Sequence, residues 1–120
     1  MPYNFQGTIN LARSQTEEAK KNFQKALEMQ SDFYPAALNL GEIERAAGNF
    51  EKARELYQSI LKTNGTHLQA MLRLSQIEQS QNNREEAEKW LTSAVKFNPD
   101  ATQARLRLVN FLLQSKKLKQ

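Results

Sequence analysis

His67 and three pairs of glutamates are the residues of this 120-residue chain whose types suggest chemistry. His67 is the single histidine, and there is no cysteine, so disulfides, thiolate metal sites and cysteine nucleophiles are excluded. A lone histidine with no cysteine and no second histidine is not a zinc site, and we find no Ser–His–Asp candidate beyond His67 itself. Since His67 follows the turn residues Asn64 and Gly65, we predict that it begins a helix.

The paired glutamates are Glu17 with Glu18, Glu42 with Glu44, and Glu85 with Glu86. Residues one or two apart on a helix point in different directions, so the carboxylates of a pair do not share a proton. We interpret all three pairs as solvated helix residues. The four glycines form no short phosphate-binding motif. We therefore predict no enzyme activity, no cofactor and no metal site.

The elements that carry these residues are helices that recur with a 34-residue period. Apolar residues at spacings of three, one, three and one, typical of an amphipathic helix, run from Ala53 to Leu61 and again from Ala87 to Val95. Turn residues separate such segments, and short turns place neighbouring helices antiparallel. The sequence predicts an all-α fold of seven helices: about 2–13, 17–30, 34–47, 50–63, 67–81, 84–97 and 101–115.

Small and aromatic residues keep the same 34-residue register. Gly7, Gly41 and Ser75 align, and we expect two helices to approach closely at these positions. Larger side chains align as Phe23, Tyr57 and Leu91, and we expect Phe23 and Tyr57 to fill the wedge between successive hairpins. The predicted turns align at Gly48, Asn82 and Lys116, and Asn49 and Asn83 are placed to cap the following helix.

These motifs resemble the tetratricopeptide repeat family over nearly the whole chain. The second copy shows Leu40-Gly41, Gly48-Asn49-Phe50, Ala53 and Tyr57, and the third shows Ala87, Leu91, Ala94 and Asn98-Pro99. The resemblance implies a right-handed superhelical α-solenoid of three helix hairpins plus a C-terminal seventh helix. We expect a single domain over 1–120, with repeats at about 1–33, 34–67 and 68–101 and a terminal helix at 102–115.

The last copy departs from the family pattern. Val109 stands where Gly41 and Ser75 stand, and the seventh helix carries more apolar residues than a solvating cap needs. We therefore expect the chain to be an excerpt of a longer array, and its terminal helices to be a candidate site of self-association. Residues 32–40 and 98–108 also resemble the tandem-repeat lipoproteins of bacterial exosortase and exopolysaccharide systems. That narrower resemblance implies a periplasmic or membrane-attached protein, whereas a chain without cysteine suits cytoplasm and periplasm equally.

In the tetratricopeptide repeat family the first helices of the hairpins line a concave groove that takes a peptide or a partner's helix. Residues three apart share a helix face, which assigns to this groove three polar pairs at 34-residue intervals. They are Asn39 and Glu42, Arg73 and Gln76, and Arg107 and Asn110. We expect a non-catalytic protein–protein interaction scaffold.

Some family members grip the C-terminal carboxylate of a chaperone with five conserved side chains. Only Asn39 and Arg73 fit that pattern here, and its other three positions hold Asn4, Thr8 and Gln69. The resemblance therefore does not extend to that ligand.

Charge suggests an alternative partner. Residues 61–120 contain 10 Lys or Arg and 5 Asp or Glu, whereas residues 1–60 contain 7 and 8. A basic half favours an anionic ligand or nucleic acid. Helical repeats that read single-stranded nucleic acid use repeated base-reading pairs, which this sequence lacks, so we consider nucleic acid the weaker interpretation.

Overall fold

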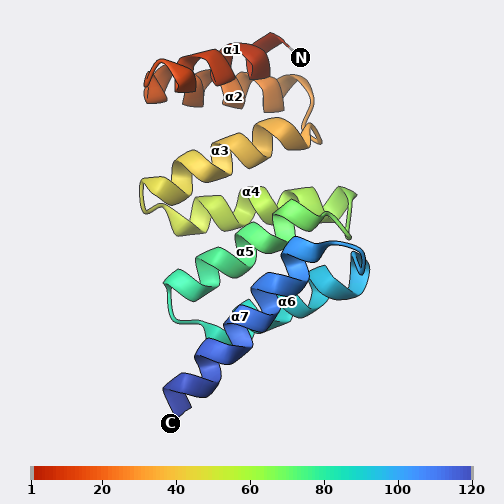
Figure 1. Ribbon diagram of the computed structural model, residues 1–120. Coiled ribbons are helices and arrows are strands. Elements are labelled where there is room, and N and C mark those ends of the chain that lie inside the picture. The colour runs from red at the N-terminus through yellow and green to blue at the C-terminus, as the bar shows by residue number, and fades with distance from the viewer. Residues whose placement is uncertain (1, 120) are drawn as a thin grey trace. The chain divides into compact units, whose positions relative to one another are not determined.

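The computed structural model describes residues 2–119, with side chains described for residues 2–117. This part of the chain forms seven α-helices and no strand, which confirms the all-α prediction (Figure 1). The helices are α1 (Pro2–Ala12), α2 (Thr16–Met29), α3 (Tyr34–Ala46), α4 (Phe50–Thr63), α5 (Leu68–Ser80), α6 (Arg84–Phe97) and α7 (Thr102–Lys119). Six of these seven helices begin and end within about two residues of the predicted bounds, as expected for assignment from sequence patterns.

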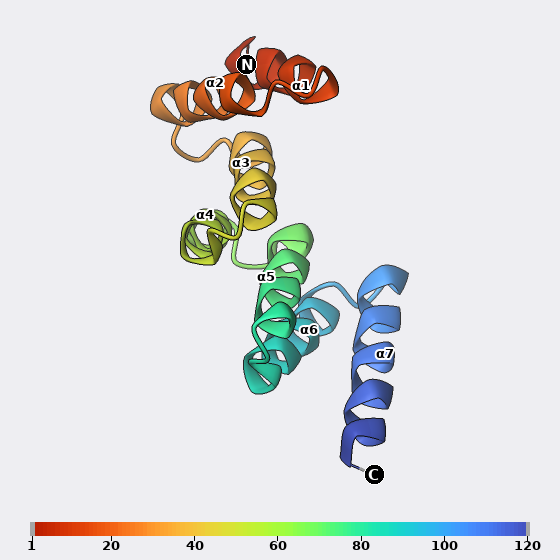
Figure 2. The ribbon, with the colours of Figure 1, turned by 90° about the vertical axis from the view of Figure 1, so that its left-hand side faces the viewer.

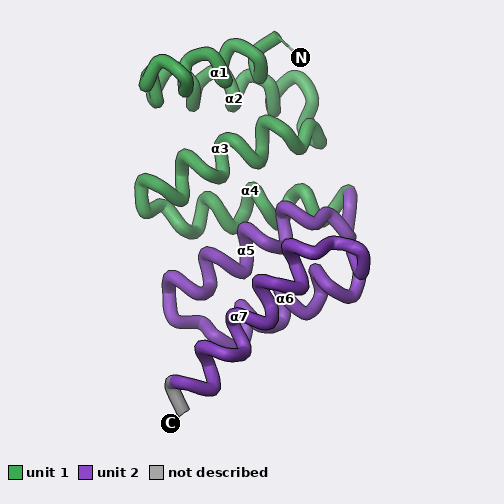
Figure 3. Tube along the Cα trace, viewed as in Figure 1, with its two compact units in different colours: residues 1–63 green, residues 64–120 purple. Residues whose placement is uncertain are grey.

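The chain divides into two compact units (Figure 3). Unit 1 covers residues 1–63 and contains α1 to α4, and unit 2 covers residues 64–120 and contains α5 to α7. The interpretation of residues 1–120 as a single domain stays a prediction.

Unit 1 consists of two helix hairpins, α1 with α2 and α3 with α4, and α2 packs against α3 (Figures 1 and 2). The small-residue prediction holds in both hairpins. A methyl group added at Gly7 would lie 2.6 Å from the ring of Phe23, and one added at Gly41 would lie 2.7 Å from the ring of Tyr57. Both rings are fully buried. Glycine is therefore required at these two positions because a side chain would occupy the space of the aromatic ring.

Unit 2 contains the hairpin of α5 and α6, and α7 packs against α6 (Figure 2). Ser75 and Leu91, both buried, stand at the positions where unit 1 has a glycine and an aromatic ring. Ser75 donates its hydroxyl to the carbonyl of Leu72 at 2.7 Å, so the polar group is satisfied within its own helix. From α7 the side chains of Ala104 and Phe111 are buried, and the guanidinium of Arg84 lies 5.5 Å from the centre of the Phe111 ring.

The turns inside the three hairpins share one backbone conformation. Ser14, Gly48 and Asn82, which occupy the same position of successive repeats, have φ angles of 60°, 85° and 61°. The residue after each donates its amide to a carbonyl five residues earlier at 2.8 Å, the pattern of a Schellman motif. Lys116, the fourth residue of this column, was predicted to lie in a turn and lies inside α7 instead. Lysine has a high helix propensity and suits the negative end of the helix dipole, so α7 continues through Lys119.

One predicted helix start, at His67, carries a side-chain cap, and another, at Asn83, does not. His67 caps α5, and its Nδ1 accepts the amide of Ala70 at 3.2 Å. Asn83 precedes α6 but makes no side-chain cap, and its side-chain amide donates to the carboxylate of Glu78 at 3.5 Å. Asn49 likewise donates to the carboxylate of Glu44 at 3.4 Å. Both asparagines therefore donate to a buried glutamate five residues earlier in the chain.

Candidate functional site

Glu44 is buried in unit 1, where the sequence had suggested a solvated carboxylate. Its side chain is 2% exposed, and the ammonium of Lys20 on α2 lies 2.8 Å from Oε1. Asn49 donates to Oε2, and Lys52 lies 3.9 Å from the same oxygen. The hydrogen bond to Glu44 raises the pKa of Lys20, more than partial burial lowers it. The buried carboxylate of Glu44 therefore lies between two cations, whose attraction offsets the cost of its desolvation.

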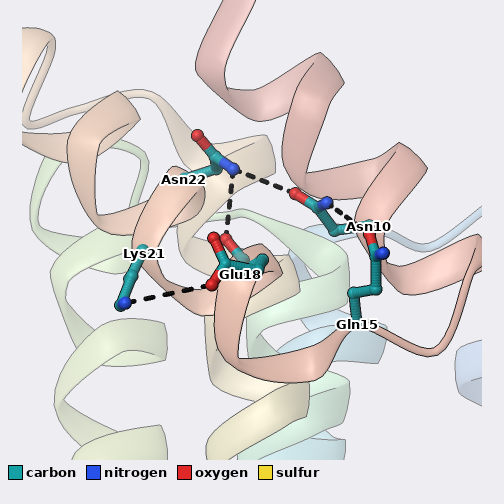
Figure 4. A network of polar contacts seen from close by, with 5 residues as sticks. All are labelled: Asn10, Gln15, Glu18, Lys21 and Asn22. Carbon is teal, nitrogen blue, oxygen red and sulfur yellow. Dashed lines mark hydrogen bonds and ion pairs between the residues drawn. The ribbon is translucent and has the colours of Figure 1, made fainter.

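The same polar position recurs in the other hairpins. Glu78 is its equivalent in unit 2 and is also buried. In the first hairpin the equivalent is Asn10, which is buried and donates to Gln15 at 2.9 Å while accepting from Asn22 at 2.9 Å (Figure 4). A polar residue that recurs once per repeat among apolar columns is a signal in the sequence, but paired acids on a helix suggested solvent instead.

The predicted groove residues of unit 1 lie together on α3. Asn39 donates to the side chain of Asn4 on α1 at 3.4 Å. Glu42 accepts from Arg45 one turn later at 2.8 Å. Asn39, Glu42 and Arg45 line a surface hollow of ≈ 570 Å³, which also reaches Lys20 and Glu44. Both acids and bases line this hollow, so it presents mixed charge.

The predicted groove residues of unit 2 come from two helices. Gln76 on α5 and Arg107 and Asn110 on α7 line one hollow of ≈ 240 Å³. Ser75, Gln79, Phe111 and Gln114 complete its wall, and none of its lining residues is an acid. Arg73 does not line this hollow; its guanidinium lies 3.5 Å from the amide oxygen of Gln76. The structure thus brings together three of the four groove residues of unit 2 and leaves Arg73 to one side.

Other kinds of site find little support within residues 2–119. No group of three or more His, Cys, Asp or Glu side chains in this range could hold a metal ion. Desolvation lowers the pKa of His67, whose ring is occupied by the helix cap. None of the helices described is both long enough and apolar enough to cross a membrane.

Solved structures with the same fold support the helix-hairpin assignment. The first TPR of Spaghetti (RPAP3), bound to the HSP90 peptide SRMEEVD, is similar with a TM-score of 0.81 and 16% identity over 98% of this chain and 91% of that one. The type III secretion translocator chaperone SycD of Yersinia enterocolitica has a TM-score of 0.81 and 16% identity, over 96% of this chain and 84% of that one. These identities are low, and the likeness concerns the fold alone.

A tetratricopeptide repeat protein from Parabacteroides merdae has a TM-score of 0.80 and 23% identity over 87% of this chain, which spans only 41% of that protein. No curated protein matches the sequence. The family model of the tetratricopeptide repeat matches twice, over residues 10–74 and 44–101, and these matches together cover more than half of the chain. With seven helices in the described residues and a regular helix-hairpin repeat, the chain belongs to the tetratricopeptide repeat family.

Proposed function

We propose that this chain is a non-catalytic protein–protein interaction scaffold that binds a peptide or a partner helix along its first helices. The residues proposed to contact the partner are Asn39, Glu42, Arg73, Gln76, Arg107 and Asn110. The observation that carries the proposal is the hollow of unit 2, because three of these residues from two different helices line it. The family supports it in general terms, since tetratricopeptide repeats are typically protein-binding scaffolds.

The chemistry of the unit 2 hollow suggests what it binds. Gln76 and Asn110 each offer an amide donor and an amide oxygen, which suit the backbone of an extended peptide. Arg107 offers a planar fork of donors that suits a carboxylate. Because no acid lines the hollow, a carboxylate there meets no repulsion from its walls. We therefore propose that the peptide contains an Asp, a Glu or a free C-terminus at this point.

A peptide library tests this proposal. Random seven-residue peptides with free C-termini are selected on the chain, and the enriched peptides are measured against Arg107→Glu by fluorescence anisotropy. We expect affinity to fall by about tenfold or more, as for the loss of a charged hydrogen bond. Lys89→Glu on α6 is the matched control, because it makes the same charge change at an exposed residue outside the hollow. Equal losses for the two variants, or no loss for Arg107→Glu, would remove the hollow from the mechanism.

A second candidate function is the binding of an anionic ligand or nucleic acid by unit 2, which its Arg and Lys residues favour. A single-stranded oligonucleotide that bound with a steep dependence on salt would support it.

The likeness to the neighbour that was solved with an HSP90 peptide does not identify the partner of this chain, since only Asn39 and Arg73 fit the carboxylate-binding pattern. We further propose, on the narrower resemblance of residues 32–40 and 98–108, that the parent protein is a tandem-repeat lipoprotein of a bacterial exosortase or exopolysaccharide system.

A further inference from the structure

One side of α7 exposes four large apolar side chains. Leu106, Val109, Leu112 and Leu113 are 58%, 51%, 44% and 54% exposed. Successive helix residues are about 100° apart, so these four fall within an arc of roughly 120°. Ala104 and Phe111, which are buried, lie on the opposite side of the helix. Figure 2 shows the corresponding arrangement, in which α7 has α6 on one side and no helix of unit 2 on the other. We call these four residues the outer face of α7.

The outer face differs from the same positions inside the repeats. Leu72, Ser75 and Glu78 on α5 stand one repeat before Leu106, Val109 and Leu112, and all three are buried. Inside the repeats, the next helix packs very closely against the position of Ser75 and Val109. At the equivalent Gly41, an added methyl group would lie 2.7 Å from the ring of Tyr57. Val109 is too large for such an approach, and Leu112 provides no carboxylate to pair with a cation of the following helix, as Glu44 does with Lys52 on α4. An occupant of the outer face therefore packs through side chains at an ordinary helix separation, roughly 8–10 Å between axes.

Charge narrows the identity of the occupant. The basic residues of α7 are Arg105, Arg107, Lys116, Lys117 and Lys119, and the helix contains no acid. Arg105, Lys116 and Lys117 are exposed. Arg105 and Lys116 are eleven positions apart, which is close to three helical turns, so they share one side at a separation of about 16 Å along the axis. Arg105 and Lys116 therefore lie on the same side of α7 as the outer face, one at each of its two ends along the helix axis.

This arrangement disfavours two other occupants. A second α7 would place cations against cations whether the two helices ran parallel or antiparallel, because both ends of the stripe are basic. A membrane surface prefers cations at the margins of the apolar arc, where they can reach the headgroups. Lys117 meets that preference, but Arg105 and Lys116 fall inside the arc, between Leu112 and Val109 in angle, and would be pressed toward the acyl region.

We propose that the outer face of α7 docks an amphipathic helix of a partner protein whose apolar stripe has an acidic residue at each end. The stripe packs on Leu106, Val109 and Leu113, and the two acids pair with Arg105 and Lys116. The pairing is satisfied in either direction of the partner helix, because the cations are disposed symmetrically about the stripe. The surface is separate from the proposed groove, since Arg107 and Asn110 lie outside the arc of the outer face.

Designed peptides test this surface. The probe is an amphipathic peptide of about 18 residues with a leucine stripe and two Glu residues eleven positions apart at its ends, and two matched peptides carry Gln or Lys there. By fluorescence anisotropy at low salt, we expect the chain to bind the Glu peptide about tenfold more tightly than the Gln peptide, because two ion pairs form beside a desolvated stripe. Arg105→Glu/Lys116→Glu should reverse the order, so that the Lys peptide binds best. Val109→Glu should abolish binding of all three.

Matched variants separate this proposal from the others. Lys89→Glu/Lys96→Glu on α6 makes the same change of charge and should leave the peptide order unchanged. Arg107→Glu should also leave it unchanged, so a failure of the proposed groove is distinguishable from a failure here. Circular dichroism checks that each variant stays helical, which we expect because the substituted side chains are exposed or half-buried.

Three results would overturn the proposal. The first is equal affinity for the three peptides, or an order that the charge reversal does not change. The second is a dimer in sedimentation that Val109→Glu abolishes and the Glu peptide leaves intact, which would assign the face to a second copy. The third is binding to vesicles of phosphatidylcholine with phosphatidylserine that Val109→Glu abolishes, together with no preference among the peptides, which would assign it to a membrane surface.

Discussion

Glu44 on α3 and Leu112 on α7 occupy the same position of the repeat, two copies apart, and their surroundings are opposite. In unit 1 a carboxylate is buried and held by Lys20. In unit 2 the last helix presents a leucine to solvent. The neighbouring column changes in the same sense, from Gly41 under a buried ring to an exposed Val109. The comparison shows that the same repeat positions hold a tight internal contact in unit 1 and exposed apolar side chains on α7, and that two columns differ between them.

Gly41→Val should give the largest effect, because it places the side chain of the last copy into the internal contact. The first added carbon would lie 2.7 Å from the ring of Tyr57, which is fully buried and cannot move into solvent. We expect a loss of about 3 kcal/mol in the free energy of unfolding, measured by urea denaturation.

Val109→Gly is the converse change and the control for Gly41→Val. At an exposed helix position it should cost about 1 kcal/mol through helix propensity alone. If Gly41→Val cost no more than Val109→Gly, the close contact would not distinguish the two helices.

Lys20→Met should give an intermediate effect, because it leaves the buried carboxylate of Glu44 without its nearest cation. We expect a loss of about 2 kcal/mol at pH 7 in urea denaturation, since removing one partner of a buried ion pair is costly. Lys20→Met/Glu44→Leu should recover most of it, because the pair of charges is then absent. A loss as large in the double variant would show that packing of the lysine stem, and not charge, is responsible.

The pH dependence of the Lys20 effect has a definite sign. The pKa of Lys20 is raised in the folded chain, so its contribution is fully present below the unfolded pKa of about 10.4. It is lost as pH rises through the higher folded pKa.

Leu112→Glu on α7 places a carboxylate at the position that Glu44 occupies on α3. It should change the free energy of unfolding by less than about 0.5 kcal/mol because the position is exposed.

His67→Asn should have a small effect at neutral pH and should change how stability depends on pH. Desolvation lowers the pKa of His67, and its Nδ1 must be unprotonated to accept the amide of Ala70. The contribution of the cap, about 1 kcal/mol, is therefore present above about pH 6.5 and lost as pH falls through the lower folded value. Thermal unfolding at pH 7.5 and pH 5 measures it. Asparagine also caps but does not titrate, so a variant with the same acid sensitivity as wild type would contradict this role.

Much of the fold followed from the sequence because helix position depends on local patterns. The repeat register and apolar spacing located all seven helices, and Gly7 and Gly41 indicated where helices approach. The end of α7 was less predictable, because Lys116 falls in a column that forms turns elsewhere and the residue itself favours a helix.

The candidate site was harder to predict because it depends on side-chain direction. The shared face of Arg107 and Asn110 followed from their spacing, and Gln76 joined them from α5. Arg73 shares the pattern but lies away from the hollow, which spacing alone does not reveal. Glu44 was misread as solvated because its burial depends on Lys20 from another helix, and no local pattern indicates that contact.

The three turn residues with positive φ angles affect where repeats of such a chain could be exchanged by genetic recombination. Ser14, Gly48 and Asn82 differ in side chain, yet all adopt a positive φ angle at the same point of the repeat. A genetic exchange that joined the chain at any two of these turns would therefore unite two backbones of the same local shape. An exchange between the turns at Ser14 and Gly48 should cost little folding, because it keeps a glycine against an aromatic ring, whereas an exchange with the turn at Asn82 would place Ser75 against such a ring.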